Sequence, residues 1–162
     1  MDNNDVLRRI RFVFDFSDAT MMALFALAEL PATREQISAW LKKEGDPPGQ
    51  ACSDTELAIF LNGLIVDKRG KKDGPPPVPE RRLNNNIIFR KLKIALNLQA
   101  EEILEIMALA QVKISKHELS AFFRAPGHNH YRACNDQMLR NFLKGLQLKY
   151  RGDLLEAEAD GR

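Results

Sequence analysis

Apolar residues recur at helical spacing along most of this chain, and no segment keeps the sustained alternation of a half-buried β-strand. Residues 4–14 show the pattern clearly, because apolar side chains share one helical face and three arginines share the other. The apolar positions are Val6, Leu7, Ile10 and Phe14, and the arginines are Arg8, Arg9 and Arg11. The same spacing in residues 86–96, and in the runs MMALFALAEL and ILEIMALAQV, predicts further helices.

Capping signals predict where the remaining helices begin. In a capping box, a Ser or Thr hydroxyl accepts a hydrogen bond from a backbone N–H, and a Glu or Gln three residues later returns one. The chain has such pairs at Thr33 with Gln36, Ser53 with Glu56, and Ser115 with Glu118. A further helix is expected to begin at Asn135–Asp136, at the position that matches Ser53.

Four glycines are expected to mark helix ends, since glycine adopts the left-handed conformation without steric cost. We expect Gly45 and Gly127 to stop the helices that begin at Thr33 and Ser115. Gly70 and Gly152 follow the next helices, whose last turns carry basic residues that suit the helix dipole.

The chain contains an internal repeat. A shift of 82 positions aligns residues 3–70 with 85–152 without a gap, and 19 of the 68 aligned pairs are identical. The predicted fold is therefore all-α, with two tandem copies of a four-helix module whose second and third helices resemble a helix-turn-helix. We expect a first repeat at 1–70, a proline-rich basic linker at 71–84, a second, basic repeat at 85–152 and an acidic tail at 153–162.

Composition favours a soluble globular protein, with 44% hydrophobic and 28% charged residues. The longest apolar run, residues 21–28, is far shorter than the roughly 20 residues of a membrane span. We therefore expect no membrane association and a cytoplasmic protein. The two cysteines, Cys52 and Cys134, occupy matching positions just before a helix start, where a dipole can lower a thiol pKa. The favoured interpretation is that both are small buried residues.

The net charge of +2 hides an asymmetry between the repeats. Residues 1–70 carry 8 Lys and Arg against 11 Asp and Glu, whereas residues 82–152 carry 12 against 5. A basic module suggests a polyanionic partner, because cations near phosphates release condensed counterions. The alternative is a solvated basic surface without a partner.

Catalytic signals are few. No glycine-rich phosphate loop, nucleophile elbow or HExxH motif occurs, so we expect no enzyme, no cofactor and no small-molecule substrate. His128, His130 and Cys134 could in principle ligate zinc. The first repeat has Asp46, Pro48 and Cys52 at these positions, which excludes a duplicated site, and no metal is expected.

The leading functional hypothesis is binding of DNA or RNA. Residues 28–41 and 113–123 resemble a helix-turn-helix, in which the second helix enters the major groove. Ile37 and Trp40, and likewise Leu119 and Phe122, would then face the core. The candidate contacts are Arg34, Lys42, Lys43, Arg90, Lys91, Lys93, Lys116, His117, Arg124, Arg132 and Arg140.

An adaptor role is the alternative hypothesis. Helix-turn-helix geometry also packs small helical bundles that never touch nucleic acid, and the first repeat is net acidic. In this case an apolar groove between the two repeats would receive a helix of another protein.

Several segments resemble the YehS-like family of small bacterial proteins of unknown function. They are CSDTELAIFLNGLIVDKRGKKDGP, NNIIFRKLKIALNL, ISKHELSAFFR and NFLKGLQL. The likeness covers residues 3–151, with the duplication and the linker, and excludes the acidic tail. It implies a duplicated helical module, and it carries over no activity, cofactor or catalytic residue.

Overall fold

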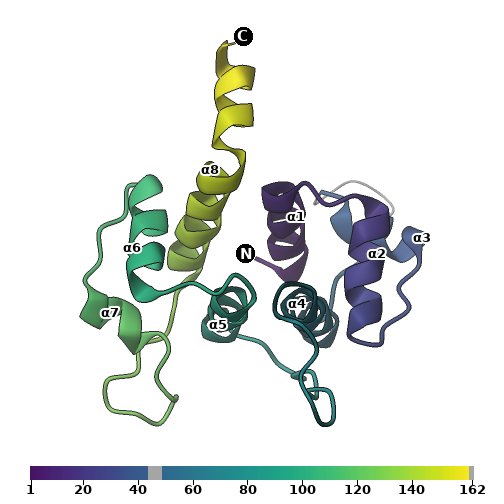
Figure 1. Ribbon diagram of the computed structural model, residues 1–162, viewed down its shortest axis with the longest axis horizontal. Helices are drawn as coiled ribbons and strands as arrows, with labels where there is room; N and C mark the ends of the chain where they lie inside the picture. The colour runs from purple at the N-terminus through teal and green to yellow at the C-terminus, as the bar shows by residue number, and fades with distance from the viewer. Residues whose placement is uncertain (44–48, 161–162) are drawn as a thin grey trace.

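The computed structural model describes residues 1–43 and 49–160, with side chains described as far as residue 152. These residues form helices and loops without a strand, which confirms the all-α class (Figure 1). The helices are α1 (Asn3–Phe14), α2 (Asp18–Leu27), α3 (Arg34–Leu41), α4 (Asp54–Arg69), α5 (Asn85–Ala95), α6 (Ala100–Leu109), α7 (Lys116–Ala121) and α8 (Asp136–Asp160). Each repeat therefore supplies four helices in the same order, α1–α4 and α5–α8.

The helix starts follow the capping signals. Thr33, Ser53 and Ser115 each cap a helix through the side-chain oxygen, and the residue three positions later completes the capping box. Asn135 caps α8, where its Oδ1 accepts a hydrogen bond from the Met138 nitrogen at 2.8 Å. These bonds satisfy N–H groups that the first helical turn leaves without a backbone partner.

Glycine predicts the helix ends less well. Gly70 ends α4 with a φ of 83°, as expected. The prediction for Gly127 is wrong, because α7 already ends at Ala121 and Gly127 is not left-handed. The prediction for Gly152 is also wrong: α8 continues to Asp160, since the Leu, Glu and Ala residues that follow are good helix formers. Gly45 lies outside the described residues.

The two repeats exchange helices across their interface. The first helix of each repeat packs mainly against the fourth helix of the other, α1 against α8 and α5 against α4. These four helices occupy the centre of Figure 1, while α2 and α3 lie on one side and α6 and α7 on the other. Because the exchange is reciprocal, the repeats form a pseudo-twofold pair.

Asp54 fastens one half of this exchange at the start of α4. Its Oδ1 accepts a hydrogen bond from Asn3 Nδ2 of the same repeat at 2.7 Å. Its Oδ2 accepts one from the backbone nitrogen of Leu83, just ahead of α5, at 2.8 Å. The same carboxylate thus holds α1 within the repeat and α5 from the other repeat.

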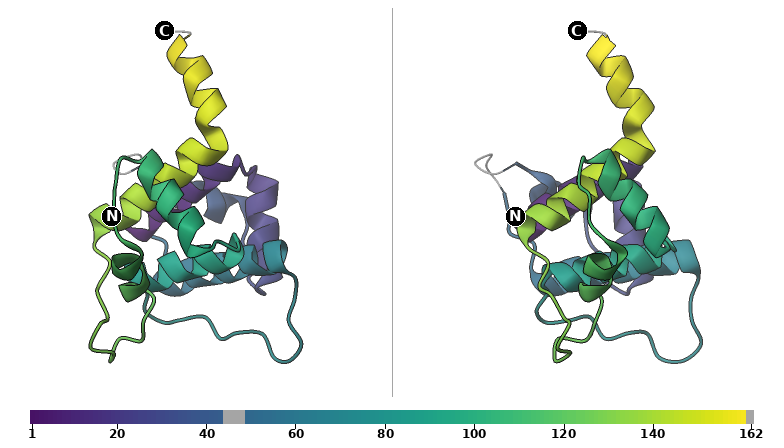
Figure 2. Two further views of the ribbon diagram at one scale, coloured as in Figure 1. Left: turned by 60° about the vertical axis from the view of Figure 1, so that its left-hand side comes forward. Right: turned by 90° about the vertical axis from the view of Figure 1, so that its left-hand side faces the viewer.

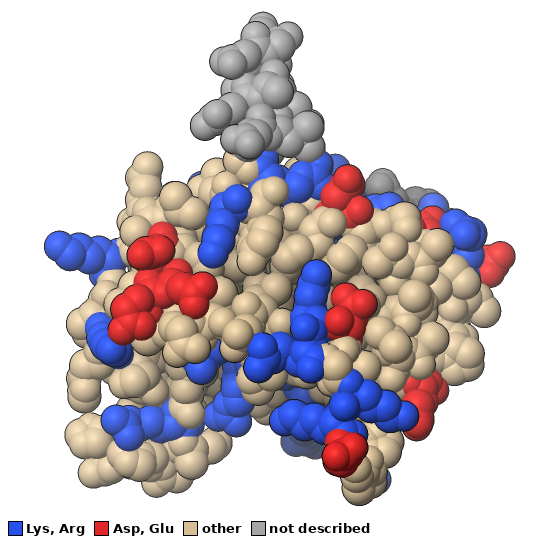
Figure 3. Space-filling model, in the orientation of Figure 1, with Lys and Arg blue, Asp and Glu red and all other residues tan. Residues whose placement is uncertain are grey.

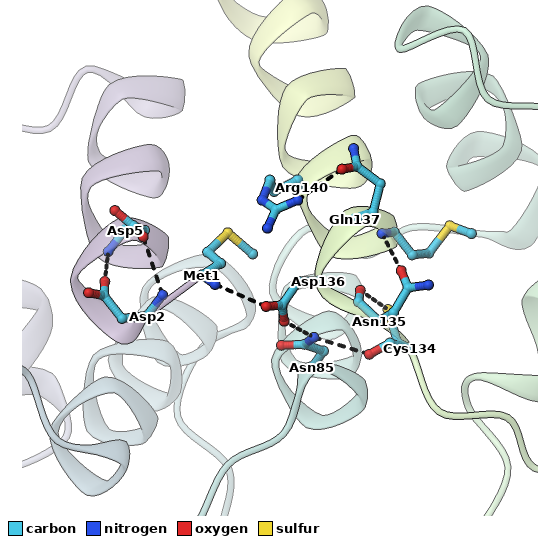
Figure 4. A network of polar contacts seen from close by, with 10 residues as sticks. Met1, Asp2, Asp5, Asn85, Cys134, Asn135, Asp136, Gln137 and Arg140 are labelled. Atoms are coloured by element: carbon cyan, nitrogen blue, oxygen red, sulfur yellow. Dashed lines mark hydrogen bonds and ion pairs between the residues drawn. The ribbon is translucent and has the colours of Figure 1, made fainter.

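Asp136 repeats the arrangement at the start of α8 (Figure 4). It accepts a hydrogen bond from Asn85 Nδ2 at 2.8 Å and one from the Met1 nitrogen at 2.9 Å. At the other end of this helix pair, Arg151 Nη1 donates to the Phe12 carbonyl at 2.8 Å. Helices α1 and α8 therefore run parallel, and pseudo-symmetry gives α4 and α5 the same direction.

The linker brings the chain back for this parallel packing. It runs along the outside of the molecule beneath α4 and α5 (Figure 2). Helix α4 has 16 residues, which span about 24 Å at about 1.5 Å per residue. At the far end of the linker, Thr55 Oγ1 donates to the Glu80 carbonyl at 3.1 Å. The extended proline run thus returns the chain to the start of α4, where α5 begins.

A second asparagine in each repeat holds the segment that follows the third helix. Asn4 Nδ2 donates to the Trp40 carbonyl at 2.9 Å and to the Gln50 carbonyl at 2.7 Å, and Asn4 Oδ1 accepts from the Cys52 nitrogen at 2.9 Å. Asn86 makes the three equivalent bonds in the second repeat. The Asn-Asn pair that opens both repeats therefore has a structural role in each.

Buried side chains of both repeats form one hydrophobic cluster. The largest are Trp40, Phe25, Phe60, Phe89, Phe122 and Phe142. Ile37, Trp40, Leu119 and Phe122 are at most 2% exposed, which confirms that these positions of the third helices face the core. At roughly 2 kcal/mol for each fully buried large apolar side chain, this shared core dominates the stability of the fold.

Two glycines at equivalent positions allow close helix crossings. A Cβ added at Gly63 of α4 would lie 1.8 Å from the Leu24 carbonyl oxygen of α2. One added at Gly145 of α8 would lie 2.2 Å from the Ile106 carbonyl oxygen of α6. The opposing atoms are backbone and cannot rotate away, so each crossing depends on glycine.

We expect Gly63→Ala to lower the free energy of unfolding by about 1–3 kcal/mol or more, because the methyl group would push α4 away from α2. Urea denaturation followed by circular dichroism measures this change. Gly152→Ala is the matched control, since nothing lies within 4 Å of its added Cβ and alanine favours the helix. Equal stability of the two variants would contradict the close crossing.

The aspartates at the helix starts predict a loss of stability in acid. Hydrogen bonds from Asn3 and Asn85, followed by those from Leu83 and Met1, lower the pKa of Asp54 and Asp136. A lowered folded pKa stabilises the fold above the unfolded value of about 3.9, and this contribution is lost as pH falls through the folded pKa. The urea concentration at the midpoint of unfolding should therefore fall as the pH is lowered below about 4.

The double variant Asp54→Asn/Asp136→Asn should be less stable at neutral pH and should show a weaker dependence in acid. Asp67→Asn/Asp73→Asn, at two exposed positions, controls for the change in net charge. An unchanged acid dependence in the double variant would show that other carboxyl groups cause it.

Candidate functional site

Three of the predicted basic residues lie together around Phe123. Arg90 Nη2 donates to the Phe123 carbonyl at 3.4 Å, and Lys93 Nζ lies 5.5 Å from the centroid of its ring. Arg124 is the next residue along the chain and is half-buried. Arg90, Lys93 and Arg124, which we call the Phe123 cluster, form a small positive surface across α5 and the end of α7.

Lys91 lies apart from this cluster, between α4 and α5. Its side chain is 12% exposed, and Nζ lies 3.0 Å from Glu80 Oε1. Nζ also donates to Asn62 Oδ1 at 2.6 Å. The ammonium group thus has internal partners, and a phosphate would have to displace Glu80 to reach it.

Other predicted contacts of the second repeat have partners of their own. Lys116 Nζ donates to Glu101 at 2.7 Å, and this bond lowers the pKa of the Glu101 carboxyl group. Arg132 lies 4.0 Å from Glu118. Arg140 is half-buried and donates to a neighbouring glutamine on α8 (Figure 4). The pairings with Glu101 and Glu118 reduce the local positive charge around α7.

The predicted residues of the first repeat also separate. Arg34 forms an exposed ion pair with Asp18 at 3.4 Å. Lys42 is half-buried, and its carbonyl accepts a hydrogen bond from Arg8 at 2.6 Å. Lys43 is exposed and lines a groove that contains several other basic residues.

The three histidines are close together and exposed. The ring centroids of His117 and His130 are 6.0 Å apart, and those of His128 and His130 are 5.5 Å apart. Cys134 is buried beneath its helix start. Within the described part of the chain, no group of three or more His, Cys, Asp or Glu side chains could hold a metal ion.

The groove lies between α1 and α8 and so joins the two repeats. It has a volume of about 800 Å³ and is open to solvent. We call it the α1–α8 groove. Its lining consists of Asp5, Arg8, Arg9, Arg11, Phe12, Asp15, Phe16, Leu41, Lys43, Gln147 and Arg151. Seven of these eleven residues are charged and three are apolar, so the groove differs from the apolar one expected for a partner helix.

Positive charge dominates this lining, with five cations and two carboxylates. Arg8 forms an ion pair with Asp5. Arg151 lies 3.4 Å from Asp15, and its guanidinium group sits 4.5 Å from the centroid of the Phe12 ring. Arg9 forms no ion pair with any carboxylate of the described residues. The site therefore offers cationic groups beside an aromatic ring that is 39% exposed.

Figure 3 shows how charge is distributed on one face of the molecule. Lys and Arg side chains gather over its middle and lower part, where α4, α5 and the linker meet, and also below the end of α8. Acidic side chains gather mainly over α6. The positive surface thus spans both repeats and is not confined to the second.

Counting charge by repeat missed the α1–α8 groove, because the first repeat is acidic as a whole. The repeat alignment contains the signal. Four groove cations have basic residues at the equivalent positions of the other repeat: Arg8 matches Arg90, Arg9 matches Lys91, Arg11 matches Lys93, and Arg151 matches Arg69. Only the packing of α1 on α8 shows that the first set surrounds one groove.

Both cysteines are buried, each 5% exposed. Burial, together with the negative charge of nearby Asp and Glu, raises the pKa of each thiol to about 12. The helix start that follows each cysteine therefore does not produce a reactive thiolate. This agrees with the structural interpretation of Cys52 and Cys134.

We expect both thiols to react with Ellman's reagent at mildly alkaline pH more than about a hundredfold slower in the folded protein than in urea. The reason is the small thiolate fraction of a buried group. The single variants Cys52→Ser and Cys134→Ser show which thiol is responsible for each kinetic phase of the reaction. Rapid reaction of either thiol in the folded protein would show an activated cysteine.

None of the helices in the described part of the chain is long and apolar enough to cross a membrane. No solved structure matches the chain. The "Uncharacterized protein YehS" of Escherichia coli (strain K12) is 45% identical over 147 residues, which is 90% of this chain and 94% of that protein. The family described as "Protein of unknown function (DUF1456)" matches twice, at residues 3–70 and 85–152. This chain, with its duplicated four-helix repeat, belongs to the DUF1456 family.

Proposed function

We propose that this protein binds single-stranded nucleic acid in the α1–α8 groove. The observation that carries the proposal is the lining of the groove, in which five cations surround an accessible aromatic ring. Proteins that bind single strands combine a positive groove for the backbone with flat side chains on which bases stack.

The individual side chains suit these two tasks. Arg9 and Lys43 are the cations of the lining that no described carboxylate engages. We propose that both contact phosphates. The guanidinium group of Arg151 lies over the Phe12 ring, and the exposed part of that ring offers a flat surface on which an unpaired base can stack.

The shape of the groove favours a single strand over a duplex. A single strand can place bases and phosphates together in a groove of about 800 Å³, whereas a duplex keeps its bases paired and stacked inside. The Phe123 cluster provides a second positive surface on the other repeat. We propose that it contacts the backbone of the same strand outside the groove.

An adaptor role would use the same groove for a helix of another protein. A partner helix in a groove is held mainly by apolar anchors. The lining has three apolar residues against seven charged ones, which favours a polyanion.

Fluorescence anisotropy tests the proposal. Labelled RNA and DNA single strands of about twelve nucleotides and a DNA duplex are titrated with protein at low and physiological salt. We expect saturable binding of the single strands that weakens steeply with salt. Arg9→Glu/Lys43→Glu should weaken binding by more than about tenfold, because it reverses the charge at two phosphate contacts.

Lys116→Glu/Arg132→Glu is the matched control, with the same change in charge near the helix-turn-helix-like segment of the second repeat. It should bind almost as the unchanged protein does. Loss of binding in this control alone would indicate that the binding site is at α7 and not in the groove. An absence of binding at tens of micromolar protein, even at low salt, would contradict the function itself.

A further inference from the structure

The duplication allows the α1–α8 junction to be compared with its equivalent at α4 and α5. Both junctions pair a first helix with the fourth helix of the other repeat, in parallel. Arg9 on α1 corresponds to Lys91 on α5, and Lys144 on α8 corresponds to Asn62 on α4. Differences at these positions show where the two junctions have diverged.

At the α4–α5 junction, an internal anion neutralises the cation. Glu80 approaches Lys91 to 3.0 Å from the linker, and the Asn62 oxygen accepts a hydrogen bond from Lys91 at 2.6 Å. Asn62 is 5% exposed, so this group of side chains is largely closed to solvent.

The α1–α8 junction lacks both of these partners in the described part of the chain. No described carboxylate pairs with Arg9. Lys144, which is exposed, occupies the position on α8 that is equivalent to Asn62 on α4. The α1–α8 junction thus has a second cation at the position where the α4–α5 junction has an oxygen acceptor.

Lys144 belongs to the same face of α8 as the groove residues. It precedes Gln147 by three residues and Arg151 by seven, and side chains at this spacing lie along one stripe of a helix. The contact of Met1 with Asp136 repeats that of Leu83 with Asp54 at the start of the other junction. Eight residues along from these contacts, Arg9 and Lys144 occupy the positions that Lys91 and Asn62 occupy on α5 and α4.

We propose that Arg9 and Lys144 together hold one phosphate group of the bound strand, in the place that Glu80 holds beside Lys91. This inference rests on the proposed nucleic-acid binding. Two neighbouring cations repel one another, and a shared anion removes that repulsion. A guanidinium fork can bind two phosphate oxygens while the ammonium group contacts the same charge.

The first test uses inorganic phosphate and no nucleic acid. Nuclear magnetic resonance follows the side-chain Nε–H signal of Arg9 while phosphate is added to the full chain. We expect this signal to shift in a saturable way, to shift less in Lys144→Asn, and to stay unchanged in Lys144→Glu. In the last variant a carboxylate inside the protein takes the place of the phosphate, as Glu80 does beside Lys91.

The second test measures RNA binding against salt concentration. Arg9→Gln/Lys144→Asn should lower the slope of log affinity on log salt by about 0.7, the contribution of one phosphate contact of a single strand. Lys149→Asn, on another face of α8, is the control and should leave the slope unchanged. Urea denaturation checks that all variants fold.

The outcomes separate the two proposals. A phosphate shift at Arg9 without RNA binding would support the anion site and overturn nucleic-acid binding. The anion site would be overturned if the double variant binds RNA with an unchanged salt slope and phosphate does not shift the Arg9 signal. The proposal that the strand binds in the groove would then remain.

Discussion

The exchange of helices between the two repeats is the constraint on which the rest of the structure depends. Helix α1 completes its packing on α8, and α5 does so on α4, so each repeat buries apolar side chains against the other. Asp54 and Asp136 hold this arrangement at its ends, because each carboxylate accepts hydrogen bonds from both repeats. The linker serves the same arrangement by returning the chain to the start of α4. The duplication therefore produces one shared core.

Several residues that are identical in both repeats hold the four helices within each repeat together. The paired asparagines at the start of α1 and α5 hold the loop ahead of the fourth helix, and Gly63 and Gly145 let the helices cross closely. Each has a geometric role in which another residue type would lose hydrogen bonds or collide with backbone. Cys52 and Cys134 fit the same description, since both are buried and donate to a neighbouring carbonyl at 3.7 Å.

The functional hypothesis rests on where the repeats differ. One helix junction is closed by the linker, where Glu80 and Asn62 satisfy Lys91. The other forms the α1–α8 groove, whose lining carries five cations. A single-chain duplication can diverge in this way, keeping one junction for stability while the other becomes available to a ligand. The predicted basic set of the second repeat separates into the Phe123 cluster, the half-buried Lys91 and several cations with partners of their own.

The sequence by itself determined the helices, their starts and the duplication, because capping and apolar periodicity depend on residues only three or four positions apart. It also determined the core positions of the third helices, such as Trp40 and Phe122. It predicted helix ends less well at Gly127 and Gly152, where glycine is compatible with several conformations. Only the tertiary structure decided which helices pair across the repeats. The pairing of α1 with α8 depends on contacts between residues more than a hundred positions apart, such as Phe12 with Arg151. For the same reason, only the tertiary structure revealed that arginines of an acidic repeat line a positive groove.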